Sequence, residues 1–62
     1  MISTYEKQTD IQTLSFTLRS DEVTGIVLVS FADMTVESST DEAARLELSL
    51  LDQGFTRIWH EA

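Results

Sequence analysis

The sequence predicts a small α+β domain, in which an antiparallel sheet of three to four strands carries one helix on one face. The order of elements is strand, strand, helix, strand. Three observations support this: residues 11–19 alternate apolar and polar side chains, residues 26–32 are almost continuously apolar, and residues 39–54 carry a helix start and a helix stop. We expect residues 1–62 to form a single domain.

The first ten residues have few apolar anchors, namely Met1, Ile2 and Tyr5. We expect this segment to be either a frayed end or a short edge strand.

Strict alternation marks residues 11–19. Leu14, Phe16 and Leu18 point one way, and hydroxyl-bearing and basic side chains point the other way. A period of two with aromatic and β-branched residues is typical of a half-buried strand.

The apolar run 26–32 follows a turn at Gly25 and predicts a central strand covered on both faces. Residues 33–38 are expected to continue it as a bent strand. The apolar side chains of the run divide between the two faces, with Ile26 and Leu28 on one and Val27, Val29 and Phe31 on the other. Because one helix covers only one face, we expect a second layer on the other, most simply another copy of the chain.

The helix has clear ends. Ser39 as N-cap and Glu42 three residues later form a capping box, Asp41 suits the positive end of the helix dipole, and Gly54 ends the helix. The chain then returns to a strand.

Phe55, Ile58 and Trp59 are the expected apolar anchors of that last strand. The size of Trp59 favours a place in the core. The strand also carries Arg57 and His60 beside an exposed edge, and Trp and Arg are enriched at binding hot spots.

Glu47 interrupts an otherwise apolar helix. On a helical wheel it lies between two apolar stripes, the first made of Ala43, Leu46 and Leu50 and the second of Ala44, Leu48 and Leu51. In one interpretation both stripes reach the sheet, and Glu47 extends to solvent or pairs with Arg57 or Arg19. In the other, one stripe packs on the sheet while the second meets a partner chain, with Glu47 at the boundary.

Little in the chain suggests catalysis, so we expect no enzyme, no cofactor and no metal site. Cys is absent, His60 is the single histidine, and the two glycines cannot form a phosphate-binding loop. A chain this short lies near the limit of independent stability, and without disulfides or a metal, association is the remaining reinforcement. We therefore expect a homodimer.

The net charge is -7, from eleven acidic and four basic side chains. Such a chain is repelled by nucleic acids and by anionic membranes, so neither is an expected partner. A protein with a basic surface is favoured instead, although acidity can also serve only solubility. The candidate partner-binding residues are Asp33, Glu37, Asp41, Glu42, Glu47, Leu48, Leu51, Arg57 and Trp59.

The stretch STDEAARLELSLLDQGFTRIW, residues 39–59, joins an acidic helix start to a Gly-Phe return into a strand. In size and order of elements the chain resembles small phage-encoded inhibitors of bacterial RNA polymerase and some anti-CRISPR proteins. The resemblance implies a host-directed protein inhibitor with Arg57 as a candidate contact.

Two functions follow as hypotheses. The first is a small acidic protein-binding module, a phage-encoded inhibitor that occupies a basic surface of a host enzyme or nucleic-acid-binding protein. The second is a structural module whose role is homo-oligomerisation. Without a targeting segment in the sequence, we expect a cytoplasmic protein, in the host cytoplasm if phage-encoded.

Overall fold

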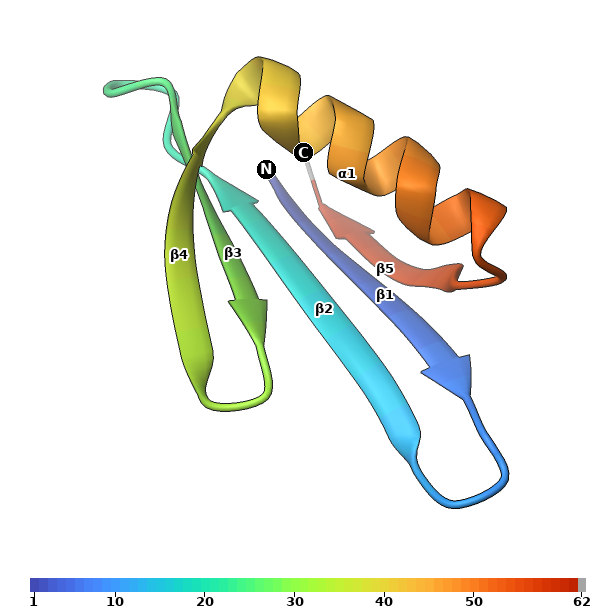
Figure 1. Cartoon of the computed structure of the whole chain (residues 1–62). Helices are drawn as coiled ribbons and strands as arrows, with labels where there is room; N and C mark the ends of the chain where they lie inside the picture. The colour runs from blue at the N-terminus through green and yellow to red at the C-terminus, as the bar shows by residue number, and fades with distance from the viewer. Residues whose placement is uncertain (62) are drawn as a thin grey trace.

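The computed structural model describes residues 1–61 and shows an α+β fold with one helix on a five-stranded antiparallel sheet (Figure 1). In chain order the elements are β1 (Ile2–Gln8), β2 (Thr13–Ser20), β3 (Ile26–Phe31), β4 (Met34–Ser39), α1 (Thr40–Asp52) and β5 (Thr56–Glu61). The strands lie in the order β4-β3-β2-β1-β5. The expected α+β class is correct, but the strand count and the ββαβ order are wrong, since the chain runs ββββαβ.

The first correction concerns the N-terminal segment, which is neither frayed nor an edge. Strand β1 lies between β2 and β5 and pairs with both. Its side chains Ser3 and Tyr5 are each only 1 % exposed. Ser3 shares a hydrogen bond with the ring of His60 on β5, Oγ to Nδ1 at 2.8 Å. The segment looked weak in sequence because one of its two buried positions is a small polar serine.

The second correction concerns residues 33–38, which form a separate strand, not a bent continuation of β3. A two-residue turn at Ala32 and Asp33 reverses the chain, and Met34 pairs with Phe31. Ala32 has a φ of 56°, a conformation that turns usually assign to Gly, Asn or Asp. Because alanine does not mark such turns, no turn was predicted here. Strand β4 becomes one edge of the sheet, and β3 lies one place in from it.

Both predicted ends of the helix are confirmed. Ser39 and Glu42 form the reciprocal capping box. At the other end the N–H of Phe55 donates to the carbonyl of Leu50 at 2.9 Å, and that of Gly54, at φ 95°, donates to Leu51 at 3.2 Å. These two bonds make a Schellman motif. Within residues 1–61 no helix is long and apolar enough to cross a membrane.

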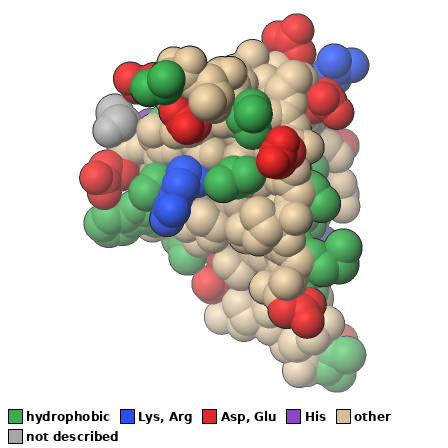
Figure 2. Space-filling view, turned by 90° about the vertical axis from the view of Figure 1, so that its left-hand side faces the viewer, with side chains coloured by type: hydrophobic (Ala, Val, Ile, Leu, Met, Phe, Trp, Pro, Cys, Tyr) green, Lys and Arg blue, Asp and Glu red, His purple; other side chains and the backbone are tan. Residues whose placement is uncertain are grey.

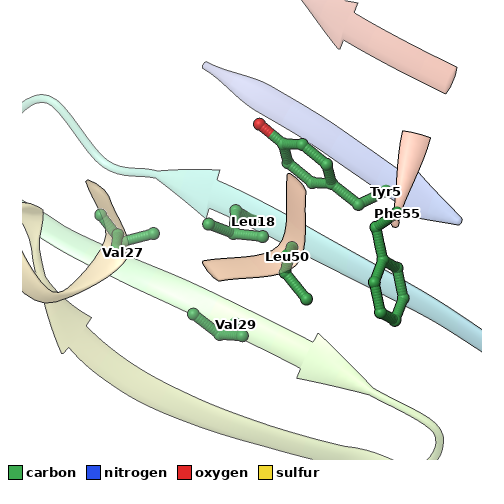
Figure 3. Close-up of a cluster of buried hydrophobic side chains, with 7 residues drawn as sticks. Tyr5, Leu18, Val27, Val29, Leu50 and Phe55 are labelled. Carbon is green, nitrogen blue, oxygen red and sulfur yellow. The ribbon is translucent and has the colours of Figure 1, made fainter. Parts of the chain in front are cut away.

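The core lies between α1 and one face of the sheet (Figure 3). It contains Tyr5, Leu18, Val27, Val29, Ala43, Leu50 and Phe55. The predicted facing of Leu18 and of Val27 with Val29 is confirmed, because these side chains are buried toward the helix while Leu28 is not. Within the described chain β3 is covered on one face only, since the sheet has one helix and that helix covers one face.

The sheet face turned away from the helix, here called the open face, is mainly polar. The strand registers place Trp59, Thr4, Thr17, Ser30 and Thr35 in one row across all five strands. Within this row the hydroxyls of Ser30 and Thr35 lie 3.1 Å apart. Apolar side chains on this face are few, so the face lacks the continuous apolar surface that would demand a second layer.

Candidate functional site

The candidate residues fall on two sides of the molecule. Glu37 and Trp59 lie on the open face, whereas Glu47, Leu48 and Leu51 lie on the helix. Asp33 is in the β3–β4 turn, one strand length (about 20 Å for six residues) from the helix start that holds Asp41 and Glu42. The acidic stretch read from the sequence is therefore not one cluster in space.

The open face does contain one place where acidic and apolar side chains meet. A shallow cavity of about 220 Å³ is lined by Asp21, Thr24, Ile26, Leu28 and Glu37. Glu37 pairs with Leu28 across β3 and β4, and Asp21 begins the loop that leads into Ile26. This cavity, here called the acid-rimmed pocket, is thus lined by the apolar side chains of Ile26 and Leu28 and by two acidic residues, Asp21 and Glu37.

Local hydrogen bonds hold the pocket wall formed by Asp21. Its Oδ1 accepts from the backbone N–H of Val23 at 2.9 Å, its N–H donates to the carbonyl of Ile26 at 2.9 Å, and its carbonyl accepts from Gly25 at 2.8 Å. Gly25 has a φ of 73°, which confirms the predicted turn. This wall is therefore fixed by the tight loop between β2 and β3.

Charges around the pocket are mixed. Asp41 and Glu42 lie two and three residues after Ser39, the β4 residue that pairs with Ile26, so they add negative charge at this end of the sheet. Arg19 pairs with Leu28 from the β2 side and so lies across that leucine from Glu37. Asp21 and Glu37 therefore lie on opposite sides of the two apolar residues, and Arg19 lies on the β2 side together with Asp21. In the space-filling view, uncharged surface predominates, with acidic and apolar side chains scattered over it (Figure 2).

The helix flank, defined here as Glu47, Leu48 and Leu51, is the second candidate surface. Leu50 in the first apolar stripe is 2 % exposed, whereas Leu48 and Leu51 in the second are 69 % and 50 % exposed. One stripe therefore packs on the sheet and the other does not, as in the second interpretation of the wheel. The structure does not bring this flank next to the acid-rimmed pocket, because the helix and the open face lie on opposite sides of the sheet.

Glu47 itself has an internal partner. The hydroxyl of Tyr5, on a side chain that is 1 % exposed, donates a hydrogen bond to the half-buried Glu47 carboxylate. Burial raises the pKa of Tyr5, and the bond to Glu47 with its negative charge raises it further, while nearby Arg57 acts in the opposite direction. Glu47 therefore serves as an acceptor for a buried tyrosine, a role that neither interpretation of the sequence included.

Trp59 does not lie in the core. It is 56 % exposed, sits opposite Thr4 on the open face, and belongs to the edge strand β5. Ile58 is likewise 54 % exposed, so of the three expected anchors of this strand only Phe55 is buried. A β-bulge at Ile58 shifts the pairing with β1 and separates the facing of Arg57 from that of Trp59.

The pocket residues that sequence reasoning did not select are Asp21, Thr24, Ile26 and Leu28. The turn before Ile26 was predicted without a role for Asp21 or Thr24, and the two apolar residues were assigned only to a covered strand. The alternation of residues 26–31 did place Ile26 and Leu28 together on one face. Nothing local indicated that Glu37 would lie beside them, because that depends on the hairpin at Ala32.

The described part of the chain holds no group of three or more His, Cys, Asp or Glu side chains placed to bind a metal ion. What the arrangement offers is surface chemistry, namely an acidic pocket with an apolar floor and an exposed apolar helix flank. No protein family, no curated protein and no solved structure matches the chain.

Proposed function

We propose that this chain is a small acidic protein-binding module that occupies a basic surface of another protein, of the kind that nucleic-acid-binding enzymes present. By covering that surface it acts as an inhibitor. The resemblance of residues 39–59 to phage-encoded host-directed inhibitors agrees with this role.

The observation that carries the proposal is the acid-rimmed pocket. A lysine or arginine side chain has an apolar stem and a cationic head, and burial of the stem with the head beside a carboxylate is favourable. In the proposed complex the stem packs on Ile26 and Leu28, and the head reaches the carboxylate of Glu37 on one side of them or of Asp21 on the other.

The net charge of -7 supports the same partner chemistry at longer range. A negative field speeds encounter with a basic surface and slows encounter with an acidic one. Because this steering is screened by salt over about 10 Å at 0.1 M ionic strength, the on-rate falls as salt rises.

Binding of a short capped oligolysine peptide, followed by NMR chemical shifts of the ¹⁵N-labelled protein, tests the pocket. The backbone amide chemical shifts of Ile26, Leu28 and Glu37 are expected to change when the peptide binds. The fully acetylated peptide lacks the positive charge and is expected to cause no such change. Glu37→Gln and Asp21→Asn each remove one negative charge, and the asparagine keeps the Oδ1 acceptor that the loop uses.

Glu6→Gln is the matched control, because Glu6 faces the same side of the sheet on β1 and its loss changes the net charge equally. Weaker binding in the two pocket variants, with little change in the Glu6 variant, supports the proposal. Equal weakening in all three variants would show that the peptide responds to overall charge and not to the pocket.

A further inference from the structure

The two edges of the sheet are protected to different extents. An exposed strand edge offers unpaired N–H and C=O groups, and proteins usually protect it with charges, bulges or short strands. Edge β5 carries Arg57, His60 and Glu61 and is interrupted by the bulge at Ile58. Edge β4 is six residues long, pairs with β3 without a bulge, and has Glu37 as its single charge.

Strand β4 also carries uncovered apolar side chains on the helix side of the sheet. Met34 and Val36 pair with Phe31 and Val29, so they share the helix face with the buried Val29. The helix does not cover them, and they remain 63 % and 50 % exposed. In Figure 1 the lower part of the β3–β4 hairpin extends beyond the helix.

The ladder with β3 determines which backbone groups of β4 are available. After a two-residue turn the closing pair, Phe31 and Met34, is the hydrogen-bonded one, and hydrogen-bonded and non-bonded pairs then alternate. Val36 therefore directs its N–H and C=O toward β3, whereas Thr35 and Glu37 direct theirs to the outside. A new strand would form its hydrogen bonds with Thr35 and Glu37.

From this pattern we infer that β4 pairs antiparallel with β4 of a second copy of the chain, about a two-fold axis at Val36. Any two-fold axis through a residue of β4 keeps the faces and the backbone pattern in phase. Only the axes at Val36 and at Glu37 pair five of the six residues of the strand. The axis at Glu37 sets two glutamates face to face, whereas the axis at Val36 sets no like charges opposite each other.

With the axis at Val36, each Thr35 faces Glu37 of the other copy in a hydrogen-bonded pair, and each Met34 faces Ser38. The two Val36 side chains meet in a non-bonded pair, where side chains approach most closely. The exposed apolar strip of each hairpin thus continues into that of the other copy. The result is a ten-stranded sheet with both helices on the same face.

The dimer does not depend on the proposed binding of a basic partner, and the two respond to salt in opposite directions. Two copies of charge -7 repel each other, so salt strengthens the dimer, whereas a complex with a basic protein weakens in salt. Sedimentation equilibrium over a range of protein and salt concentrations is expected to show a monomer–dimer equilibrium that shifts toward dimer as salt rises.

The absence of cysteine from the chain allows a direct test of the axis. Val36→Cys places two thiols across a non-bonded pair, within the Cα distance of about 4.4–6.8 Å that a disulfide needs. Under mild oxidation this variant is expected to form a covalent dimer. Leu48→Cys is the control, because Leu48 is more exposed, at 69 %, but lies on the helix away from β4.

Charge at position 35 tests the register independently. Thr35→Glu faces Glu37 of the other copy and is expected to raise the dissociation constant relative to Thr35→Lys by about two- to thirtyfold, for two pairs per dimer. Thr13→Glu and Thr13→Lys change the net charge equally on β2, far from the axis, and are expected to differ much less. A wild-type chain that stays monomeric at every concentration and salt, or a Leu48→Cys variant that cross-links as fast as Val36→Cys, would overturn the inference.

Discussion

The hydrogen bond between Tyr5 and Glu47 is expected to couple the two residues energetically, and a double-mutant cycle measures that coupling. Tyr5→Phe removes the donor and leaves a half-buried carboxylate that water can still reach. A hydrogen bond to a charged group contributes about 1.5–3 kcal/mol, and partial exposure of Glu47 favours the lower end, so we expect a loss of about 1.5 kcal/mol.

Glu47→Leu acts differently, because it leaves the hydroxyl of a tyrosine that is 1 % exposed without an acceptor. An unsatisfied buried hydroxyl costs about 1–3 kcal/mol, which the added apolar contact of leucine offsets only in part. In the double variant Tyr5→Phe/Glu47→Leu neither group remains. Its loss of unfolding free energy is therefore expected to be well below the sum of the losses of the two single variants. We expect a coupling energy of about 1–2 kcal/mol.

Urea denaturation followed by far-UV circular dichroism gives the four free energies of unfolding. Glu47→Gln is the matched control, since its amide oxygen still accepts the hydroxyl but carries no charge, and it is expected to cost roughly half as much as the leucine variant. Additivity of the two single losses to within about 0.3 kcal/mol would refute the reasoning, because the bond would then contribute nothing to stability.

Three further predictions concern pH, capping and packing. The pKa of Tyr5 is raised in the folded protein, so its stabilising contribution is present below the ordinary pKa of 10.0 and is lost as pH rises through the folded value. Absorbance at 295 nm of this single tyrosine should show that it ionises at a higher pH than a free tyrosine. A melting temperature that does not fall above pH 10 would contradict the prediction. Ser39→Ala removes the N-cap acceptor and should cost about 1 kcal/mol in urea denaturation; because the capping hydrogen bonds lower the pKa of Glu42, wild-type stability should also decline as pH falls below its ordinary 4.5. Leu50→Ala should cost about 2–5 kcal/mol while Leu48→Ala changes stability by less than about 0.5 kcal/mol, and similar losses in both would mean that the two helix stripes are buried alike.

Local signals in the sequence determined the helix completely. The capping box spans three residues, from Ser39 to Glu42, and Gly54 adopts the positive φ that ends the helix, so both ends depend only on near neighbours. Alternation in residues 13–18 and 26–29 likewise determined which side chains face the core, because a strand has a period of two wherever it is placed in a sheet.

Tertiary structure alone decided where those strands lie in the sheet and which side chains meet on their exposed faces. Tyr5 and Glu47 are 42 positions apart, and no local pattern links a residue of β1 to one of α1. The separate strand β4 depends on a turn at Ala32. Alanine rarely takes a positive φ without support from the surrounding fold. That turn sets Glu37 beside Leu28 and leaves β4 as an edge, and so creates both the acid-rimmed pocket and the proposed dimer contact. The sequence by itself therefore determined the helix and the inner faces of β2 and β3, whereas strand pairing between distant segments decided the places of β1 and β4 and the surfaces.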